Sequence, residues 1–151
     1  MADKTMPITG GCMCGAIRYE ATEHPQETGY CHCSMCQAAS GNAFIAYAVF
    51  RSTAFRFTHG KPKLYRSSAW MDRGFCADCG TPVINRYLKG NDIVVTMLCS
   101  LDHPEEWPPA MHVGIESQMP WLAIHDDLPR TRTEDDDDFI ALQAAIDQGV
   151  D

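Results

Sequence analysis

The sequence lacks any long apolar run. No window approaches 18 consecutive apolar residues, and the first eleven residues contain no apolar segment of the signal-peptide kind. A membrane-spanning helix needs about 20 apolar residues, so neither a spanning helix nor a secretory leader is expected. We therefore expect a cytoplasmic protein in a reducing compartment, where disulfides rarely persist.

Positive charge is also scarce. Lys and Arg total 12 against 20 for Asp and Glu, which gives a formal net charge of −8, and no Lys/Arg-rich run occurs. Nucleic acid and anionic membrane surfaces attract clustered positive charge, so neither is an expected partner. The G-x-S-x-G, Walker A, G-x-G-x-x-G and H-x-x-x-H patterns are absent as well, so the familiar enzyme classes that use them lack their signatures here.

The overall composition is that of an ordinary globular protein. The chain has 151 residues, of which 45% are hydrophobic and 21% charged. This length fits one domain with a sizeable core of its own, so we predict a single domain over residues 1–151.

Short strands separated by turn residues dominate the pattern. About eight segments alternate or are rich in β-branched residues, and Ile93–Cys99 (IVVTMLC) is the most strongly β among them. Another short strand is expected within Met111–Ile115, and Ser117–Arg132 is expected to be irregular. We predict a mostly β fold of small antiparallel sheets.

Two helical segments are predicted within this β framework. Ser34 suits the N-cap of a short helical turn, SMCQAAS, that Gly41 closes. Thr133 suits the N-cap of a longer helix over Glu134–Gln148, where five carboxylates at the start match the positive end of the helix dipole.

Cysteine is the residue type that the sequence does have in abundance. Seven of the eight cysteines fall into three clusters: the C-x-C pair Cys12 and Cys14, the C-x-C-x-x-C triad Cys31, Cys33 and Cys36, and the C-x-x-C pair Cys76 and Cys79. The eighth, Cys99, stands alone. In a reducing compartment such clusters are typical of metal ligands or reactive thiols.

The two cysteine pairs resemble each other. Each is followed at once by glycine, Gly15 and Gly80, which permits a turn with positive φ that brings backbone amides toward the sulfurs. Two such pairs can close a tetrahedral zinc site, so we predict that Cys12, Cys14, Cys76 and Cys79 share one ion. Two separate half-sites or free thiols are the alternatives. Four thiolates also accommodate iron.

The triad then lacks a fourth partner. Three protein ligands with one open position are typical of catalytic zinc, whereas structural sites are closed. Three thiolates leave a net charge of −1 on a divalent ion, which suits deprotonation of an incoming thiol better than activation of water. We therefore predict a thiol-activating site at Cys31, Cys33 and Cys36.

Other residues compete for the fourth position. Cys99 can complete a second closed site, although a lone cysteine on an apolar strand is more often simply buried. His32 lies between two ligands, and its adjacent position directs it elsewhere. The remaining histidines are scattered and are expected to be surface or satisfied residues: His24, His59, His103, His112 and His125.

Four segments together resemble a known family. GGCMCGAIRYE, CHCSMCQAASG, RSSAWMDRGFCADCGTPV and LCSLDHPEEWPPAMHV are similar to segments of the glutathione-dependent formaldehyde-activating enzyme family, also called the GFA or centromere-protein-V domain. The resemblance spans about residues 9–128 and leaves a C-terminal helical extension at about 133–148. It implies an Mss4-like fold of small sheets around zinc knuckles.

The resemblance also implies chemistry. A structural zinc is implied at Cys12, Cys14, Cys76 and Cys79, and a second zinc, of open occupancy, at Cys31, Cys33 and Cys36. The family reaction, classed as a carbon–sulfur lyase, joins glutathione to formaldehyde, so a small thiol and an aldehyde are the implied partners. Lys63, Arg66 and Arg73 are candidates for binding the carboxylates of glutathione.

This chain departs from the family pattern at Cys99, where a small residue is expected. Two other functions stay open at this point: a non-catalytic zinc module that binds another protein, and a redox or zinc-buffering role for the triad.

Overall fold

The residues that the structure describes fold into two β-sheets with two α-helices. The structure is a computed structural model that describes residues 6–89 and 92–148. The smaller sheet contains β1 (Ile8–Gly11), β2 (Arg18–Ala21) and β5 (Phe55–His59). The larger sheet has the spatial order β11 (Arg130–Thr131), β10 (His112–Val113), β3 (Glu27–Cys31), β4 (Ile45–Arg51), β9 (Ile93–Met97), β8 (Pro82–Tyr87), β7 (Met71–Phe75) and β6 (Lys63–Ser68).

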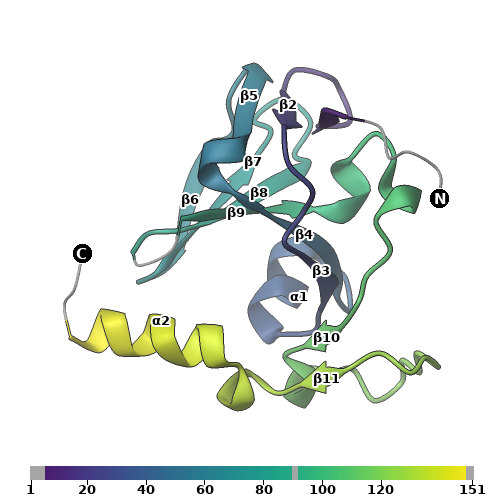
Figure 1. Ribbon diagram of the computed structural model, residues 1–151, viewed down its shortest axis with the longest axis vertical. Coiled ribbons are helices and arrows are strands. Elements are labelled where there is room, and N and C mark those ends of the chain that lie inside the picture. The colour runs from purple at the N-terminus through teal and green to yellow at the C-terminus, as the bar shows by residue number, and fades with distance from the viewer. Residues whose placement is uncertain (1–5, 90–91, 149–151) are drawn as a thin grey trace.

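Both α-helices lie away from the small sheet. The small sheet occupies one end of the molecule, and the C-terminal helix crosses the opposite end (Figure 1). The α-helices are α1 (Ser34–Ser40) and α2 (Asp137–Asp147). The short 3₁₀ turns are η1 (Ser52–Ala54), η2 (Leu98–Ser100), η3 (Pro104–Glu106), η4 (Ile115–Ser117) and η5 (Thr133–Asp135). The predicted mostly β fold with a short helix and a C-terminal helix is thereby confirmed.

The large sheet separates two apolar clusters because side chains alternate along each strand. In β4, Ala48 and Phe50 belong to the cluster that includes the small sheet. Tyr47 and Val49, on the other face of the same strand, belong to a second cluster. The cysteine pairs contribute to the first cluster and the triad to the second, so the two sulfur groups lie on opposite sides of the sheet.

Pairing departs from the prediction at one edge. Most neighbouring strands are antiparallel, but β10 pairs in parallel with both β3 and β11. β11 falls inside the segment predicted to be irregular, and two residues are too few to give a period-2 pattern. Cys99 lies in η2 and is exposed, so the expectation that it ends a strand in the interior is wrong.

Both helices begin elsewhere than predicted. Cys33, not Ser34, caps α1, because its sulfur accepts a hydrogen bond from the amide of Cys36 at 3.3 Å. Asp136, not Thr133, caps α2, and its carboxylate accepts from two amides of the first turn. Gly41 closes α1 with a φ of +66°, as predicted. The single-domain division, whose ends at 1–5 and 149–151 lie outside the described residues, stays a prediction.

Candidate metal centres and the adjoining cavity

Two similar turns carry the cysteine pairs. The loop from β1 to β2 and the loop from β7 to β8 each close with a hydrogen bond from a glycine amide to the carbonyl of the first cysteine. These bonds are Gly15 N to Cys12 O, 3.1 Å, and Gly80 N to Cys76 O, 2.9 Å. Both glycines have positive φ, +80° and +78°, as predicted from their position after the cysteines. The two loops are therefore equivalent knuckles.

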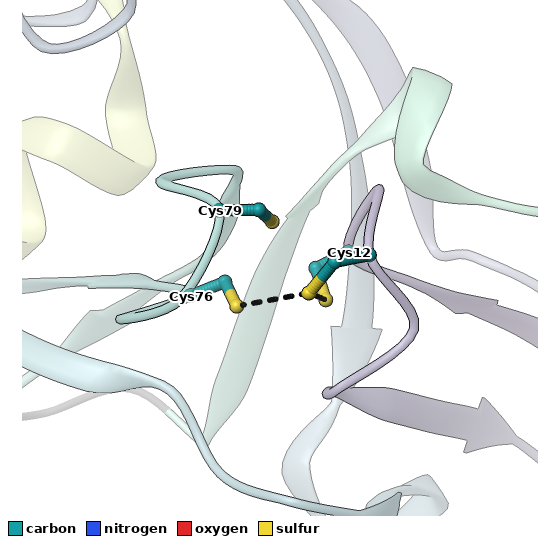
Figure 2. A group of neighbouring side chains, drawn as sticks. Cys12, Cys76 and Cys79 are labelled. Atoms are coloured by element: carbon teal, nitrogen blue, oxygen red, sulfur yellow. Dashed lines mark hydrogen bonds between the residues drawn. The ribbon is translucent and has the colours of Figure 1, made fainter.

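The knuckles place their sulfurs around a common point. The four Sγ atoms all lie within 4.8 Å of one another, with Cys12 to Cys14 at 3.6 Å and Cys14 to Cys76 at 3.7 Å. Figure 2 shows Cys12 from one knuckle directed toward Cys76 and Cys79 from the other. Sulfurs of a tetrahedral zinc site lie about 3.8 Å apart, so this group can hold a metal ion without rearrangement.

Local hydrogen bonds favour the thiolate form of Cys12 and Cys79, whereas hydrogen bonds with those two thiols outweigh the amide of Ala16 and raise the pKa of Cys14 to about 12. Burial opposes ionisation of Cys12, but the amide of Ile17, 3.2 Å from its sulfur, and the neighbouring thiols outweigh burial and lower its pKa. The hydroxyl of Thr81, 3.1 Å from Cys79, is the main cause that lowers the pKa of that thiol to about 6. Deprotonated sulfurs are what a metal requires.

The triad is built differently. Cys31 ends β3, Cys33 caps α1 and Cys36 lies in the first turn of that helix. Their three Sγ atoms lie within 4.8 Å of one another, and among the residues that the structure describes no Cys, His, Asp or Glu joins them as a fourth. Gly114 approaches closely: a Cβ there would lie 2.9 Å from the amide nitrogen of Cys33. The absence of a side chain at Gly114 therefore allows η4 to pack against Cys33, the N-cap residue of α1.

A cation faces the triad. The guanidinium of Arg73, on β7, lies 3.8 and 3.9 Å from the sulfur of Cys36 and 3.5 Å from Asn85 Oδ1. Hydrogen bonds from the thiols of Cys31 and Cys36, followed by the amide of Cys36 and the charge of Arg73, lower the pKa of Cys33 despite burial. Negative charge on Cys33 is thus stabilised by the chain itself, whereas the hydrogen bond with Cys33 raises the pKa of Cys31 and contributes to raising that of Cys36.

A cavity of about 880 Å³ adjoins the triad. The three cysteines and Arg73 line one side of it, and its aromatic lining comes from Tyr47, Trp70, Tyr87 and Phe139. Trp70 stacks on Tyr87 with ring centroids 5.9 Å apart and meets Phe139 edge-on at 5.6 Å. This volume accommodates a ligand of small-peptide size.

The tyrosines of the cavity keep their protons at neutral pH. Burial is the largest cause that raises the pKa of Tyr87 to about 12, and the nearby sulfurs and Asp136 add to it. The pKa of Tyr47 is raised by burial and by Glu27, whose carboxylate accepts a hydrogen bond from the Tyr47 hydroxyl at 2.6 Å. Each phenol is a hydrogen-bond donor, not a base.

A second, smaller cavity of about 490 Å³ lies on the other side of Cys36 and Arg73. Its walls are largely apolar and come from α1 and from β7 and β8, with Met35, Ala39 and Phe75 among them. Both cavities share Met35, Cys36, Ile45, Arg73 and Asn85. The triad therefore has space on two sides.

Buried histidines fix the segment between β3 and α1, where the triad lies. His32 is fully buried, and its Nε2 lies 2.8 Å from His112 Nδ1, while His112 Nε2 lies 2.9 Å from Asp126. Gln37 donates to the carbonyl of His32 at 2.8 Å. His32 is thus directed to His112, as its position between two ligands predicts, and His112 is a satisfied buried histidine.

The predicted basic residues separate in space. Arg73 lines both cavities, whereas Arg66 pairs with Asp72 at 2.7 Å and Lys63 is exposed at the start of β6. Their role toward substrate carboxylates stays a prediction. Cys99, which stood as an alternative fourth ligand, belongs to neither sulfur group. All eight cysteines are free of disulfides.

Sequence reasoning missed the far wall of the cavity. Asp135–Asp138, Phe139 and Leu142 line it, although they follow the triad by about 100 residues. The apolar positions of α2 predict a buried helix face, but they do not say which surface that face covers. No helix among the described residues is long and apolar enough to cross a membrane.

Comparison with known proteins agrees with this architecture. The family model described as glutathione-dependent formaldehyde-activating enzyme matches residues 7–117. A protein of Schizosaccharomyces pombe, named as an uncharacterized lyase, is 29% identical over 83 residues, which are 55% of this chain. The match spans only 60% of that relative's length.

A solved structure is also similar. The crystal structure of a Rhodobacter sphaeroides protein matches with a TM-score of 0.52 and 21% identity, over 62% of this chain and 87% of the other. At this identity the likeness shows the fold alone.

Proposed function

Because the chain belongs to the glutathione-dependent formaldehyde-activating enzyme family, we propose that it is a metal-dependent carbon–sulfur lyase acting on adducts of a small thiol and an aldehyde. The reaction is of the S-hydroxymethylglutathione synthase type. The observation that carries this proposal is the triad of sulfurs that borders a cavity of about 880 Å³ and has no fourth protein ligand among the described residues.

The two sulfur groups take different roles in this proposal. Cys12, Cys14, Cys76 and Cys79 hold a structural ion, because four thiolates leave no position for a ligand. Cys31, Cys33 and Cys36 hold a second ion at the cavity. Zinc is the ion proposed for both, and when bound at the triad it lowers the pKa of an incoming thiol.

The chain's own residues organise the rest of the reaction. Arg73 offsets the negative charge that gathers when a thiolate approaches three cysteine sulfurs. The cavity holds both reactants close, which removes much of the entropic cost of their encounter. Tyr87 keeps its proton and donates a hydrogen bond to the carbonyl oxygen as that oxygen gains charge.

The chemistry balances without an added oxidant or reductant. The thiolate sulfur forms a bond to the aldehyde carbon, the carbonyl π electrons move to oxygen, and oxygen takes the proton that the thiol lost. The product is a thiohemiacetal. The reverse direction breaks the same carbon–sulfur bond, which is the lyase reaction.

Exchange spectroscopy tests the proposal. Zinc-loaded protein is incubated with glutathione and formaldehyde, then with other thiols and aldehydes, and exchange between free and adduct forms is followed by NMR. We expect faster exchange than in buffer, loss of that effect in Cys33→Ser, and its retention in the control Cys99→Ser. Exchange no faster than in buffer for every pair would overturn the proposal.

A further inference from the structure

The wall opposite the triad comes from residues beyond the family match. The family model ends at residue 117, whereas η5 and α2 follow it. The helix is held by Leu142, which is buried, and by Phe139, whose ring meets Trp70 edge-on at 5.6 Å. A segment outside the matched region thus faces the proposed reaction site across the cavity.

Charge is distributed unevenly around this cavity. Six carboxylates line it: Glu27, Glu116, Asp135, Asp136, Asp137 and Asp138. Arg73 is the cation among the lining residues that the structure describes, and it is already directed at Cys36 and Asn85. Arg132 is the basic residue nearest in sequence to Asp135–Asp138. It pairs with Glu134 at 2.6 Å, and neither of these two residues lines the cavity. A ligand with free carboxylates meets net repulsion here.

The aromatic residues give an independent indication of the ligand. Trp70, Tyr87 and Phe139 line the same cavity as the carboxylates, with Trp70 in contact with both of the other rings. Aromatic faces attract ammonium groups, and the attraction grows when water is excluded. An aromatic cluster next to carboxylates is the combination by which proteins recognise organic cations.

From these observations we propose that the thiol substrate carries an ammonium group and no net negative charge. Its sulfur approaches Cys31, Cys33 and Cys36, and its ammonium group lies between the Trp70–Tyr87–Phe139 rings and Asp135, Asp137 and Asp138. This inference rests on the proposed function and narrows it, because glutathione, with two carboxylates and one ammonium group, is then a poor ligand.

Length-matched thiols test the charge preference. Cysteamine, 2-mercaptoethanol and 3-mercaptopropionate differ in the end group, which is cationic, neutral or anionic. Each is titrated, alongside glutathione, into protein loaded with Co²⁺, and binding is followed through the thiolate-to-cobalt absorption. The four thiols differ in their own pKa values, and this affects their affinities. The affinity of each thiol is therefore compared between the wild type and a variant, because the pKa of the thiol is the same in both measurements.

The test variant is Asp135→Asn/Asp137→Asn/Asp138→Asn, which leaves the capping residue Asp136 in place. The matched control is Asp127→Asn/Glu134→Gln/Asp147→Asn, which changes net charge equally at exposed positions off the cavity. We expect the test variant to reduce the preference for cysteamine over 3-mercaptopropionate about tenfold at low salt and the control to change it less than about twofold.

The outcomes separate the two proposals. No binding of any thiol to the cobalt-loaded wild type would overturn the proposed function, and this inference with it. Binding with equal affinity for cationic and anionic thiols, with a preference for glutathione, or with a preference that the test variant leaves unchanged would overturn the inference alone.

Discussion

The two sulfur groups differ in how the chain brings them together. The knuckle group joins residues 62 positions apart, Cys14 and Cys76, across two glycine turns that hold the small sheet to the large one. The triad comes from six consecutive positions at the junction of one strand and one helix. An ion in the first group cross-links distant elements. An ion in the second would link only the end of one strand to one helix, and the lack of a fourth protein ligand among the described residues would leave a position for a small molecule.

The largest expected effect follows from removing a knuckle sulfur. In Cys76→Ser, the free energy of unfolding should fall by at least about 3 kcal/mol, because binding of a structural ion contributes directly to folding. Thermal unfolding by circular dichroism and a metal count per chain measure this. If Cys33→Ser destabilises the protein as much as Cys76→Ser does, the knuckle group does not contribute more to stability than the triad.

The next effect concerns the triad and catalysis. Cys33→Ser should lower the rate of adduct exchange by more than about 100-fold while the free energy of unfolding changes by less than about 1 kcal/mol. Serine preserves the capping of α1, so loss of activity reports loss of the sulfur. Cys99→Ser should behave as wild type, and equal losses in both variants would contradict a special role for the triad.

A smaller effect is expected at the cation beside the triad. Arg73→Met should lower exchange about tenfold, and Arg73→Lys should retain more activity, because a positive charge near Cys36 is kept. Two thiol substrates, with and without carboxylates, distinguish two possible roles of Arg73. If Arg73 serves the sulfurs, the defect persists with 2-mercaptoethanol, which has no carboxylate. A defect confined to glutathione would assign Arg73 to carboxylate binding instead.

The smallest effect lies in the sheet that separates the two groups. Asp72 is buried, and Arg66 and Arg86 hold the pKa of its carboxyl below its ordinary value. A depressed pKa contributes stability that is present above about pH 4 and is lost as the pH falls through the folded pKa. Urea unfolding should therefore show Asp72→Asn about 1 kcal/mol less stable at pH 7.

That difference has a defined pH dependence. It should shrink as the pH falls below about 4 and reach zero below the depressed pKa of the folded protein, where the wild-type carboxyl is neutral, as the asparagine side chain is. A constant difference across pH would show that Asp72 acts through packing instead of charge.

Local chemistry explains what the sequence could predict. The positive φ at Gly15 and Gly80 follows from residue spacing, because a knuckle is a local structure. The same holds for the strands that flank the knuckles. That the two knuckles meet was predicted from the likeness of their sequences, with separate half-sites as the alternative. The N-cap of α1 was misassigned to Ser34 because a sulfur can accept the capping hydrogen bond as a hydroxyl does.

Long-range packing explains what the sequence could not predict. The parallel pairing of β10 with β3 and the position of α2 across the cavity depend on tertiary contacts that no local pattern records. The acidic run at Glu134–Asp138 shows this limit of local patterns. As a helix start it suits the dipole, yet most of it also lines the cavity that the triad borders.

The parallel pairing of β10 with β3 has a consequence for folding kinetics. His32 and His112 are 80 positions apart, so the strand that carries the triad gains its edge partner only after a long loop has closed. Closing such a loop costs conformational entropy before the contacts between its ends contribute stabilising free energy. Proteins rich in contacts between residues far apart in sequence therefore fold slowly. We therefore expect the cavity beside the triad to be assembled late in folding. We expect metal ions present during refolding to encounter the cysteines first as separate local motifs, before the site beside the cavity is complete.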